Sequence, residues 1–409
     1  MKYKVIRNEK YDFIGQSYAT AYPNMHKYPA TMIPQIGIEL FKELNVFKGK
    51  LLDPYCGSGS SFTVGLDRGL NEMYGFDINP LAVLISKAKF TKVDISKIKE
   101  GKEKLRNDIY EFIKNEQNAN SVQIPDYLNI DFWFSREVLK SLSIIKNFIY
   151  KIPFEIRNLF LIPFSETIRE CSYTRNNEFK LYRIKDEQIM LFNPDVYGIY
   201  FNKLNRALDI YEKYYLPKIN HAKIEISFNK FPKQENYFDV VLTSPPYGDS
   251  KTTVAYGQFS MFSNQWLDIQ NARQIDNLLM GGKKVKELYK NSYITKFIEE
   301  ISNQSIKRAL EISSFYYDLH YSINDVATSI KKGGKSIYIV GNRRVKDIQL
   351  PTDQFVAEKF EENGFKHLFT YERLLGNKSM PSQNSPTNKV GQRRSTMTSE
   401  FIVVCKKIK

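Results

Sequence analysis

Two short segments of the chain combine glycine, proline and polar side chains in arrangements that could do chemistry. The first is Asp53-Pro54-Tyr55-Cys56-Gly57-Ser58-Gly59-Ser60. Its glycines let the backbone approach a ligand closely. A helix that begins at Ser60 would also offer unpaired N–H groups and the positive end of its dipole. The segment therefore predicts a turn that binds a ligand, and a tight turn without a ligand is the alternative for Gly-x-Gly alone.

Two carboxylates narrow the class of ligand for this turn. Asp53 lies at its tip, where a carboxylate would repel a phosphate and attract a cation, and no Gly-Lys-Ser/Thr follows as in a P-loop. Asp77 ends the next apolar run, at the place where a carboxylate commonly binds ribose hydroxyls. The implied ligand has a ribose, a carboxylate and a positive centre. S-adenosylmethionine fits this description, whereas NAD and ATP fit it less well.

The second segment is Thr243-Ser244-Pro245-Pro246-Tyr247, which follows an apolar run. The prolines fix φ, restrict the residue before each of them to extended backbone, and donate no N–H. The Ser244 hydroxyl and nearby carbonyls can then accept hydrogen bonds from an exocyclic amino group, which leaves its nitrogen lone pair free for attack. Tyr247 offers a ring on which a flat base can stack, a contact worth roughly 1–3 kcal/mol. A rigid turn without a ligand is the alternative for Pro-Pro alone.

Alternating strands and helices must position both segments. The spacing predicts a helix over 31–45, a strand ending at Asp53, a helix over 60–69 and a strand over 73–76. Further on it predicts strands over 238–243, 336–340, 367–374 and 401–405, a turn at Gly333-Gly334, a helix around 353–363 and an exposed basic loop over 376–398. These are βαβ units with a parallel sheet. Because such sheets bind ligands at the carboxyl ends of their strands, we expect the two segments at adjoining strand tips.

Helical spacing replaces the strand pattern between residues 96 and 222. Ser135 is a candidate helix cap, and Tyr200, Leu204, Leu208, Tyr211 and Tyr215 form one apolar stripe that indicates core packing. We therefore divide the chain into 1–95, the N-terminal half of a catalytic domain, 96–222, a helical insertion that could recognise a target, and 223–409, the C-terminal half. Arg157, Arg169, Arg175 and Arg183 in the insertion could read guanines, or the insertion could be a scaffold without base contacts. The stretch 261–310 is a second candidate for target recognition.

Composition excludes several classes of protein. The 409 residues include 60 Lys and Arg against 45 Asp and Glu, and the net charge of +15 favours a polyanionic partner such as nucleic acid. A hydrophobic content of 42% excludes a disordered chain. No apolar run approaches the roughly 20 residues that span a bilayer, and the first residues lack a secretory h-region, so we expect a cytoplasmic protein. The cysteines and histidines are scattered, so we expect neither disulfides nor a metal.

Together the two segments resemble the amino-methylating DNA methyltransferases of bacterial type II restriction–modification systems. The similarity extends to His26-Lys27-Tyr28-Pro29-Ala30, to Gly75-Phe76-Asp77-Ile78-Asn79-Pro80 and to the stretch 333–407. It implies an α/β fold, a seven-stranded Rossmann-like S-adenosylmethionine-dependent methyltransferase sheet with a mainly helical insertion. The family often carries an acidic residue on the strand before the proline motif; Ile226-Ser227-Phe228-Asn229 stands there instead.

The resemblance implies roles for individual residues. The cofactor-binding residues would be Asp53, Tyr55, Cys56, Gly57, Ser58, Gly59, Asp77 and Ile78. The catalytic residues would be Ser244, Pro245, Pro246 and Tyr247. The predicted substrate-binding residues also include Tyr28, and Thr252, Thr253 and Tyr256, which follow the proline motif and could contact the base or its neighbours, or belong to an ordered loop without such contacts. Lys378, Arg393 and Arg394 lie in predicted loops and are candidates for phosphate contacts or for solvated surface charges. The substrate would be double-stranded DNA with the target base flipped out, methylated by a monomer or dimer that works beside a cognate restriction endonuclease.

Ser-Pro-Pro-Tyr resembles the branch of the family that methylates cytosine N4. Methylation of adenine N6 in DNA and of guanine N2 in RNA remain alternative activities. A DNA-binding protein that keeps the fold without catalysis is a rival of a different class. Cytosine-C5 methylation is disfavoured because it needs a thiol nucleophile, and Cys56 lies inside the cofactor turn. No PD-(D/E)xK nuclease motif is evident in the sequence.

Overall fold

The fold is built on one central sheet, seen in a computed structural model that describes residues 2–15, 22–29, 31–115, 122–176, 178–228, 231, 234–248, 256–375, 383–384, 394–395 and 397–409. The sheet has eight strands. In spatial order they are β1 (Val5–Arg7), β9 (Phe365–Leu374), β12 (Ser399–Lys407), β6 (Ile330–Val340), β5 (Phe238–Thr243), β2 (Lys50–Asp53), β3 (Glu72–Asp77) and β4 (Lys223–Phe228). Two short hairpins accompany it: β7 (Arg344–Val345) with β8 (Ile348–Gln349), and β10 (Gln383–Asn384) with β11 (Arg394–Ser395).

All strands of the central sheet pair in parallel except β12, which is antiparallel to both β6 and β9. This order and this single reversed strand are those of a Rossmann-like methyltransferase sheet, which confirms the expected fold class. The sheet has eight strands rather than the expected seven, because the N-terminal residues add β1 in parallel to the edge of β9. A strand of three residues is too short to show the alternation of apolar and polar residues that predicts a strand from sequence. It forms because its backbone pairs with the exposed edge of β9.

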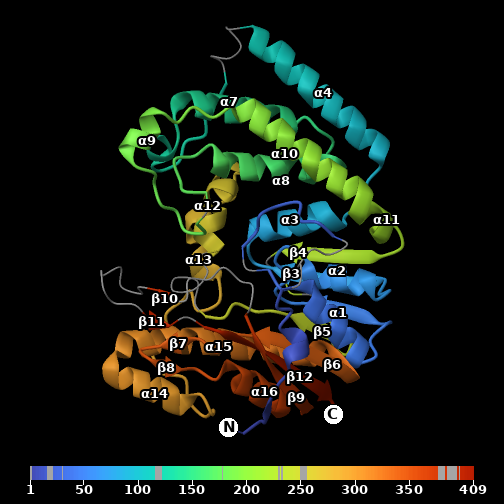
Figure 1. Cartoon of the computed structure of the whole chain (residues 1–409), viewed down its shortest axis with the longest axis vertical. Helices are drawn as coiled ribbons and strands as arrows, with labels where there is room; N and C mark the ends of the chain where they lie inside the picture. Colours follow the sequence, from blue (N-terminus) through green and yellow to red (C-terminus); the bar gives the residue numbers. More distant parts are fainter. Residues whose placement is uncertain are drawn as a thin grey trace.

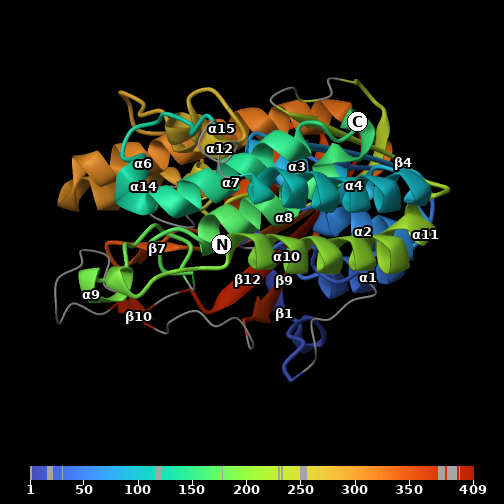
Figure 2. The same ribbon diagram turned by 90° about the horizontal axis from the view of Figure 1, so that it is seen from above.

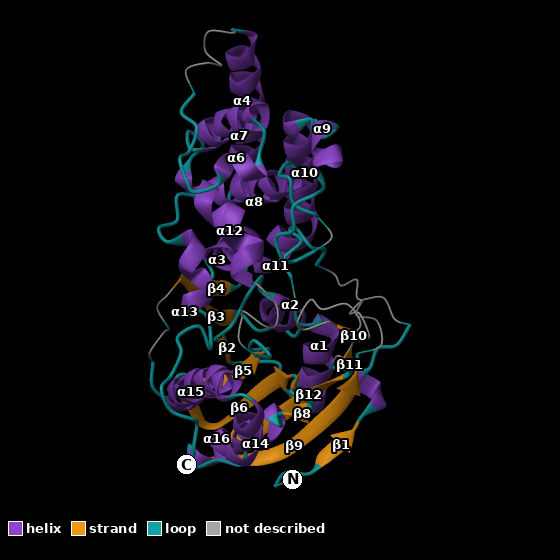
Figure 3. Ribbon diagram, turned by 90° about the vertical axis from the view of Figure 1, so that its left-hand side faces the viewer, coloured by secondary structure: helices purple, strands orange, loops and turns teal. Residues whose placement is uncertain are grey.

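Helices cover both faces of the sheet (Figure 3). On one face lie α1 (Pro34–Glu43), α2 (Ser60–Asp67) and α3 (Pro80–Phe90), and on the other α14 (Thr295–Gln304), α15 (Ile306–Ser329) and α16 (Thr352–Glu362). Consecutive strand residues alternate between the two cores: Leu51 packs with the first group and Leu52 with the second. The helix expected over 31–45 and that expected around 353–363 are confirmed as α1 and α16.

The turn expected at Gly333-Gly334 is wrong. Both glycines lie inside β6, which begins at Ile330. The pairing of β6 with β5 shifts register between Phe238 and Val240, whose partners are Ile330 and Lys335. Gly333 has a φ of +83°, a backbone conformation that glycine adopts readily. The glycine pair therefore makes a bulge in a long strand instead of separating a strand from a loop.

A helical region stands above the sheet in Figure 1, and in Figure 2, which is seen from above, its helices lie in front of the sheet. Its elements are α4 (Ile95–Lys114), α6 (Ile130–Trp133), α7 (Arg136–Ile149), α8 (Phe154–Glu170), α9 (Asp186–Met190), α10 (Val196–Ile210), η2 (Tyr211–Tyr215) and α11 (Leu216–Ile219). Ser135 caps α7 by accepting the backbone N–H of Val138, as predicted. The tyrosine and leucine stripe of α10 and η2 is buried, which confirms its core role.

A column of structure connects the helical region to the sheet. Helix α12 (Tyr256–Trp266) runs from the sheet up to the helical region, where it ends at Trp266. The chain then continues through η3 (Ala272–Gln274) and α13 (Ile275–Leu278), which lies below α12 in Figure 1. The fully buried Trp266 of α12 packs its ring against Phe134 and Phe164 of the helical region. The other end of α12 lies near the end of β3, since Ser260 of α12 accepts a hydrogen bond from Asn79, two residues after β3. No helix in the described parts of the chain is both long enough and apolar enough to cross a membrane.

Candidate active site

The two sequence motifs meet at the carboxyl ends of neighbouring strands. β2 and β5 pair in parallel, with Leu51 opposite Val240 and Leu52 opposite Val241. At the strand tips the Thr243 hydroxyl donates a hydrogen bond of 2.6 Å to Asp53 Oδ1. This contact joins the residue that ends one strand to the residue that ends the other. The expectation that the glycine turn and the proline loop lie on adjoining tips is confirmed.

Asp53 is held almost entirely by its own chain. Its carboxylate is 4% exposed, accepts the backbone N–H of Tyr55 at 3.1 Å and also accepts the hydroxyl of Ser61. Burial raises the pKa of Asp53 to about 6, although the hydrogen bonds from Ser61 and Thr243 act in the opposite direction. Because both carboxylate oxygens are engaged by the chain, the structure gives Asp53 the task of fastening the two loops together.

The two glycines of the turn have different physical reasons to be glycine. Gly57 and Gly59 have φ values of +49° and +85°. A Cβ on Gly59 would lie 2.3 Å from the Phe90 ring, so this glycine lets the turn pack closely on α3. A Cβ on Gly57 would meet only the Tyr28 ring, at 3.8 Å. Gly57 therefore borders open space beneath Tyr28, and this space is where a ligand can approach the backbone.

Helix α3 holds the carbonyl groups of the same turn. Ser86 Oγ donates to the Gly57 carbonyl at 2.6 Å, and Lys89 Nζ donates to the Ser58 carbonyl at 2.9 Å. Lys89 is 3% exposed, and burial lowers its pKa to about 8. The turn is thus fixed from the side of α3. No sequence signal marks these two residues, because they lie within an ordinary apolar helix pattern.

Asp77 ends β3 beside the turn. Its Oδ2 accepts the Gly57 N–H and its Oδ1 accepts the Asn79 N–H, each at 2.8 Å. Burial is the main reason that the pKa of Asp77 is raised, against the effect of these backbone donors. Each carboxylate oxygen keeps a lone pair beyond the one that its backbone donor uses. Asp77 can therefore accept hydroxyl groups of a sugar while the backbone fixes its orientation.

Aromatic side chains lie over this carboxylate. The rings of Tyr28 and Tyr256 stack with centroids 6.1 Å apart and planes 28° apart. Asn79 Nδ2 donates to the Tyr28 hydroxyl and to Ser260 Oγ of α12, both at 3.2 Å. Tyr28 and Tyr256 are predicted from the sequence to contact the substrate. In the structure they come together next to Gly57 and Asp77, at the cofactor side of the strand tips.

These features fit S-adenosylmethionine, the cofactor that the sequence predicts. The Asp77 carboxylate is held in place and can accept hydrogen bonds from ribose hydroxyls, and open space lies beside Gly57, whose φ is positive. Two predicted cofactor residues face elsewhere. The Tyr55 hydroxyl donates to Ser322 of α15, and the Cys56 side chain is 4% exposed, with its backbone N–H bonded to the Phe76 carbonyl at 3.0 Å. Ser58 and Ile78 lie in the turn and directly after β3.

The proline loop is rigid and tied to the rest of the sheet. Pro245 is buried, and Ser244, Pro246 and Tyr247 are half-buried. Ser244 Oγ lies 3.2 Å from the Tyr247 hydroxyl, which donates to Glu400 Oε1 at 3.0 Å. The Ser244 side chain is thus partly exposed, and the Tyr247 hydroxyl beside it is fixed by its hydrogen bond to Glu400.

Two residues that anchor this loop escaped the sequence argument. Glu400 of β12 and Arg373 of β9 are opposite each other in the antiparallel pair, and their side chains form an ion pair of 2.5 Å. They are 2% and 0% exposed. Arg373 Nε also donates to the Tyr11 carbonyl at 2.7 Å. The sequence offers one weak signal, a glutamate directly before the apolar run that closes the chain.

Close packing also fixes the end of the proline loop. A Cβ on Gly248 would lie 1.9 Å from Nη1 of Arg343, so glycine is needed for that guanidinium to pack against the loop. Four residues predicted to bind substrate, Thr252, Thr253, Lys378 and Arg393, lie outside the described residues. Arg394 begins the short strand β11.

The arginines of the helical region have structural partners. Arg157 donates to the carbonyls of Tyr150 and Ile152. Arg169 is 8% exposed and donates to the Glu178 carbonyl at 2.5 Å. Arg183 pairs with Asp186 at 2.6 Å and Arg175 with Glu178 at 3.3 Å. The backbone contacts of Arg157 and Arg169 favour a scaffold role for these two residues, whereas Arg175 and Arg183 lie in ion pairs at the surface and both alternatives stay open for them.

All three cysteines are unfavourable nucleophiles. Cys56, Cys171 and Cys405 are free and buried. Burial raises the pKa of each thiol, to about 12 for Cys171 and well above the ordinary value for Cys56. A buried thiol held neutral cannot attack a base. The structure thus agrees with the argument against cytosine-C5 chemistry.

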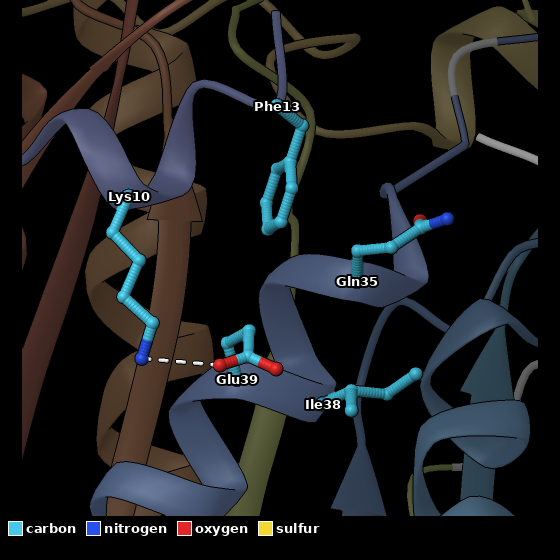
Figure 4. Close-up of a pocket in the computed structure, with 5 residues that line it drawn as sticks. All are labelled: Lys10, Phe13, Gln35, Ile38 and Glu39. Atoms are coloured by element: carbon cyan, nitrogen blue, oxygen red, sulfur yellow. Dashed lines mark ion pairs between the residues drawn. The ribbon is translucent and has the colours of Figure 1, made fainter. Parts of the chain in front are cut away.

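A separate cavity lies between η1 (Glu9–Tyr11) and α1. It has a volume of about 330 Å³ and is lined by Lys10, Phe13, Gln35, Ile38 and Glu39 (Figure 4). An ion pair of 3.1 Å between Lys10 and Glu39 crosses it. No residue predicted to bind cofactor or substrate lines this cavity, so it is not part of the candidate active site.

Comparison with known proteins identifies relatives. No protein-family model matches the chain. The type II methyltransferase M.MvaI of Kocuria varians is 42% identical over 412 aligned residues, which cover 93% of this chain and 90% of that protein. The type II methyltransferase M.MjaII of Methanocaldococcus jannaschii is 26% identical over 49% of this chain and 37% of that protein. A solved S-adenosylmethionine-dependent methyltransferase of Methanosarcina mazei is 9% identical, covers 90% of this chain and 97% of its own, and superposes with a TM-score of 0.31, too low to support a conclusion.

Proposed function

Because the chain belongs to the type II methyltransferases, we propose that it transfers the methyl group of S-adenosylmethionine to the exocyclic N4 of cytosine in double-stranded DNA. The observation that carries this proposal is the hydrogen bond of 2.6 Å between Thr243 and Asp53. It holds a turn suited to a ribose-bearing cofactor beside a loop suited to an amino group. Methylation of a specific site would protect it from a cognate restriction endonuclease.

The cofactor site would form around the end of β3. Asp77 would accept the ribose hydroxyls, the backbone at Gly57 would approach the cofactor, and the Tyr28 and Tyr256 rings would close the site above it. When bound, S-adenosylmethionine supplies a methyl group on a positively charged sulfur. Lys89 and Ser86 fasten the turn from below, so that it does not have to rearrange when the cofactor arrives.

The target amine would lie against the proline loop. Ser244 Oγ and a carbonyl of the loop would each accept one amino hydrogen, and the Tyr247 ring would stack on the base. The nitrogen lone pair then points to the methyl group, the N–C bond forms as the S–C bond breaks, and the extra proton leaves the nitrogen for water. No covalent bond to the protein forms. Positioning two reactants on rigid strand tips supplies most of the rate acceleration.

The net charge of +15 suits a DNA substrate. We propose that residues 96–222, together with the column that begins at α12, carry target recognition, since this region stands beside the strand tips in Figures 1 and 3. A duplex that contacts it would bring a flipped base to the tips of β2 and β5. Adenine N6 is the second candidate target, because its amino group could occupy the same acceptors.

One experiment tests the function directly. Plasmid DNA is incubated with the protein and S-adenosylmethionine, digested to nucleosides and analysed by mass spectrometry. N4-methyl-2′-deoxycytidine in the digest supports the proposal, N6-methyl-2′-deoxyadenosine supports the second candidate, and 5-methyl-2′-deoxycytidine refutes the amino-directed chemistry. A parallel incubation with RNA tests guanine N2. The absence of any methylated base from all substrates, with a protein that binds S-adenosylmethionine, would support a DNA-binding protein without catalysis.

A further inference from the structure

Four polar groups form one continuous chain from the core to the proline loop. Arg373 Nη1 donates to Glu400 Oε2 at 2.5 Å, and the Tyr247 hydroxyl donates to Glu400 Oε1 at 3.0 Å. The Tyr247 oxygen lies 3.2 Å from Ser244 Oγ. This chain starts on β9, passes through β12 and ends at the residue proposed to hold the target amine. The first two groups are buried and the last two lie at the surface of the site.

The chemistry of the buried end fixes the direction of every hydrogen bond in the chain. A guanidinium only donates, and an ionised carboxylate only accepts. Tyr247 must therefore give its single hydroxyl hydrogen to Glu400. The Tyr247 oxygen then has only lone pairs to offer Ser244, so the Ser244 hydroxyl hydrogen points back toward Tyr247. The remaining lone pairs of Ser244 Oγ are left to face outward, toward the target amine.

We propose that Glu400 is a positioning residue that makes Ser244 an obligatory hydrogen-bond acceptor. A serine hydroxyl can otherwise rotate and present its hydrogen, which would repel an amino N–H. With its hydrogen directed at Tyr247, Ser244 behaves toward the amine like a carboxylate or an amide oxygen, but without a charge. The inference rests on the proposed function, because it assigns the acceptor that the target amine meets.

The burial of the ion pair supports a functional reason for its presence. Arg373 and Glu400 are 0% and 2% exposed, and buried ion pairs are often no more stabilising than apolar residues of similar volume. Two opposed β-branched or aromatic residues would be compatible with the backbone pairing of β9 and β12 at this register. An acceptor at the Tyr247 hydroxyl is what the pair adds. Arg373 is itself anchored to the Tyr11 carbonyl at 2.7 Å, which keeps the carboxylate in place.

The variant Glu400→Gln reverses the chain while preserving its shape. Toward Arg373 only the amide oxygen of glutamine can accept, so its NH₂ group must face Tyr247. Tyr247 then accepts that hydrogen and donates its own to Ser244, and Ser244 presents its hydrogen to the amine. We expect kcat to fall by about ten- to a hundredfold, while the KM for DNA and the affinity for S-adenosylmethionine change by less than about threefold.

A double-mutant cycle separates this role from a structural one. Tyr247→Phe keeps the ring and removes the connection between Glu400 and Ser244, and it lowers kcat by itself. In the Tyr247→Phe background we expect Glu400→Gln to change kcat by less than about threefold, because reversal no longer reaches Ser244. Glu300→Gln, an exposed substitution on α14, is the matched control for loss of a carboxylate and should leave kcat unchanged.

Equal losses of kcat from Glu400→Gln in both backgrounds would overturn the inference, since a general disturbance of the sheet acts regardless of Tyr247. If Glu400→Gln does not fold, as judged by urea unfolding, the apolar pair Arg373→Met with Glu400→Met replaces it. This pair removes the acceptor and should again lower kcat only when Tyr247 is present. Failure of the parent protein to methylate any base would refute the proposed function instead, so the two failures are distinguishable.

Discussion

The hydrogen bond between the strand tips makes a quantitative prediction. Thr243→Val replaces the hydroxyl that donates to Asp53 Oδ1 by a methyl group of nearly the same size. Thr243 is 0% exposed, so water cannot take the place of the lost donor. Asp53 keeps only Ser61 and the Tyr55 N–H as donors. The substitution therefore leaves a buried carboxylate less well solvated by the protein.

The magnitude depends on pH, because it depends on the charge of Asp53. Its pKa of about 6 lies above the ordinary value of 3.8, so the folded state binds the proton more tightly than the unfolded chain. The parent protein consequently gains stability as the pH falls from about 6 toward 4, and loses this gain above 6. At pH 8 the carboxylate is ionised and the lost bond to a charged acceptor should cost about 2 kcal/mol of unfolding free energy. At pH 5 the group is mostly protonated, and the loss should be about 1 kcal/mol or less.

Urea unfolding of the parent and of Thr243→Val at pH 8 and pH 5 measures these differences. Thr243→Ser is the matched control, since it keeps the donor and removes only a methyl group. It should show a small loss of about 1 kcal/mol that is the same at both pH values. Equal unfolding free energies for the parent and Thr243→Val at pH 8, or a valine effect that does not depend on pH, would refute the idea that this bond fastens the two loops.

Three further substitutions test the site. Ser244→Ala should retain S-adenosylmethionine affinity by calorimetry but reduce methyl transfer by about a hundredfold or more; a turnover equal to that of the parent would remove Ser244 from catalysis. Asp77→Ala should weaken S-adenosylmethionine binding by about tenfold or more, and unchanged affinity would exclude the ribose role. Lys89 has a pKa of about 8, below the ordinary 10.5, so it should lose its proton at a lower pH in the folded state than in the unfolded chain. Between pH 8 and 10.5 the unfolded chain therefore binds more protons, and the parent should gain up to about 3 kcal/mol of stability as the pH rises. Lys89→Met should lack this gain in urea unfolding, and identical pH profiles would show that Lys89 is not buried as described.

The sequence alone determined those parts of the protein whose physics is local. Some residue types indicate the local backbone conformation directly. Examples are the glycines of the cofactor turn, Asp77 at the end of the strand that follows this turn, and the proline pair after a buried strand. Apolar spacing predicted the strands on both sides of the cofactor turn and the stripe of α10. These local signals, taken with the rule that parallel strands bind ligands at their carboxyl ends, were enough to bring the two motifs together.

Only the tertiary structure decided which distant groups support the motifs. Thr243 and Asp53 are separated by 190 residues, and Tyr247 and Glu400 by 153 residues, yet each pair is in hydrogen-bond contact. The sequence around Glu400 does not predict which residue pairs with it, because strand order and register decide which side chain lies opposite. The same holds for Gly59, which is glycine because Phe90 packs against it. Side-chain packing across the sheet, which no local spacing encodes, gives these residues their roles.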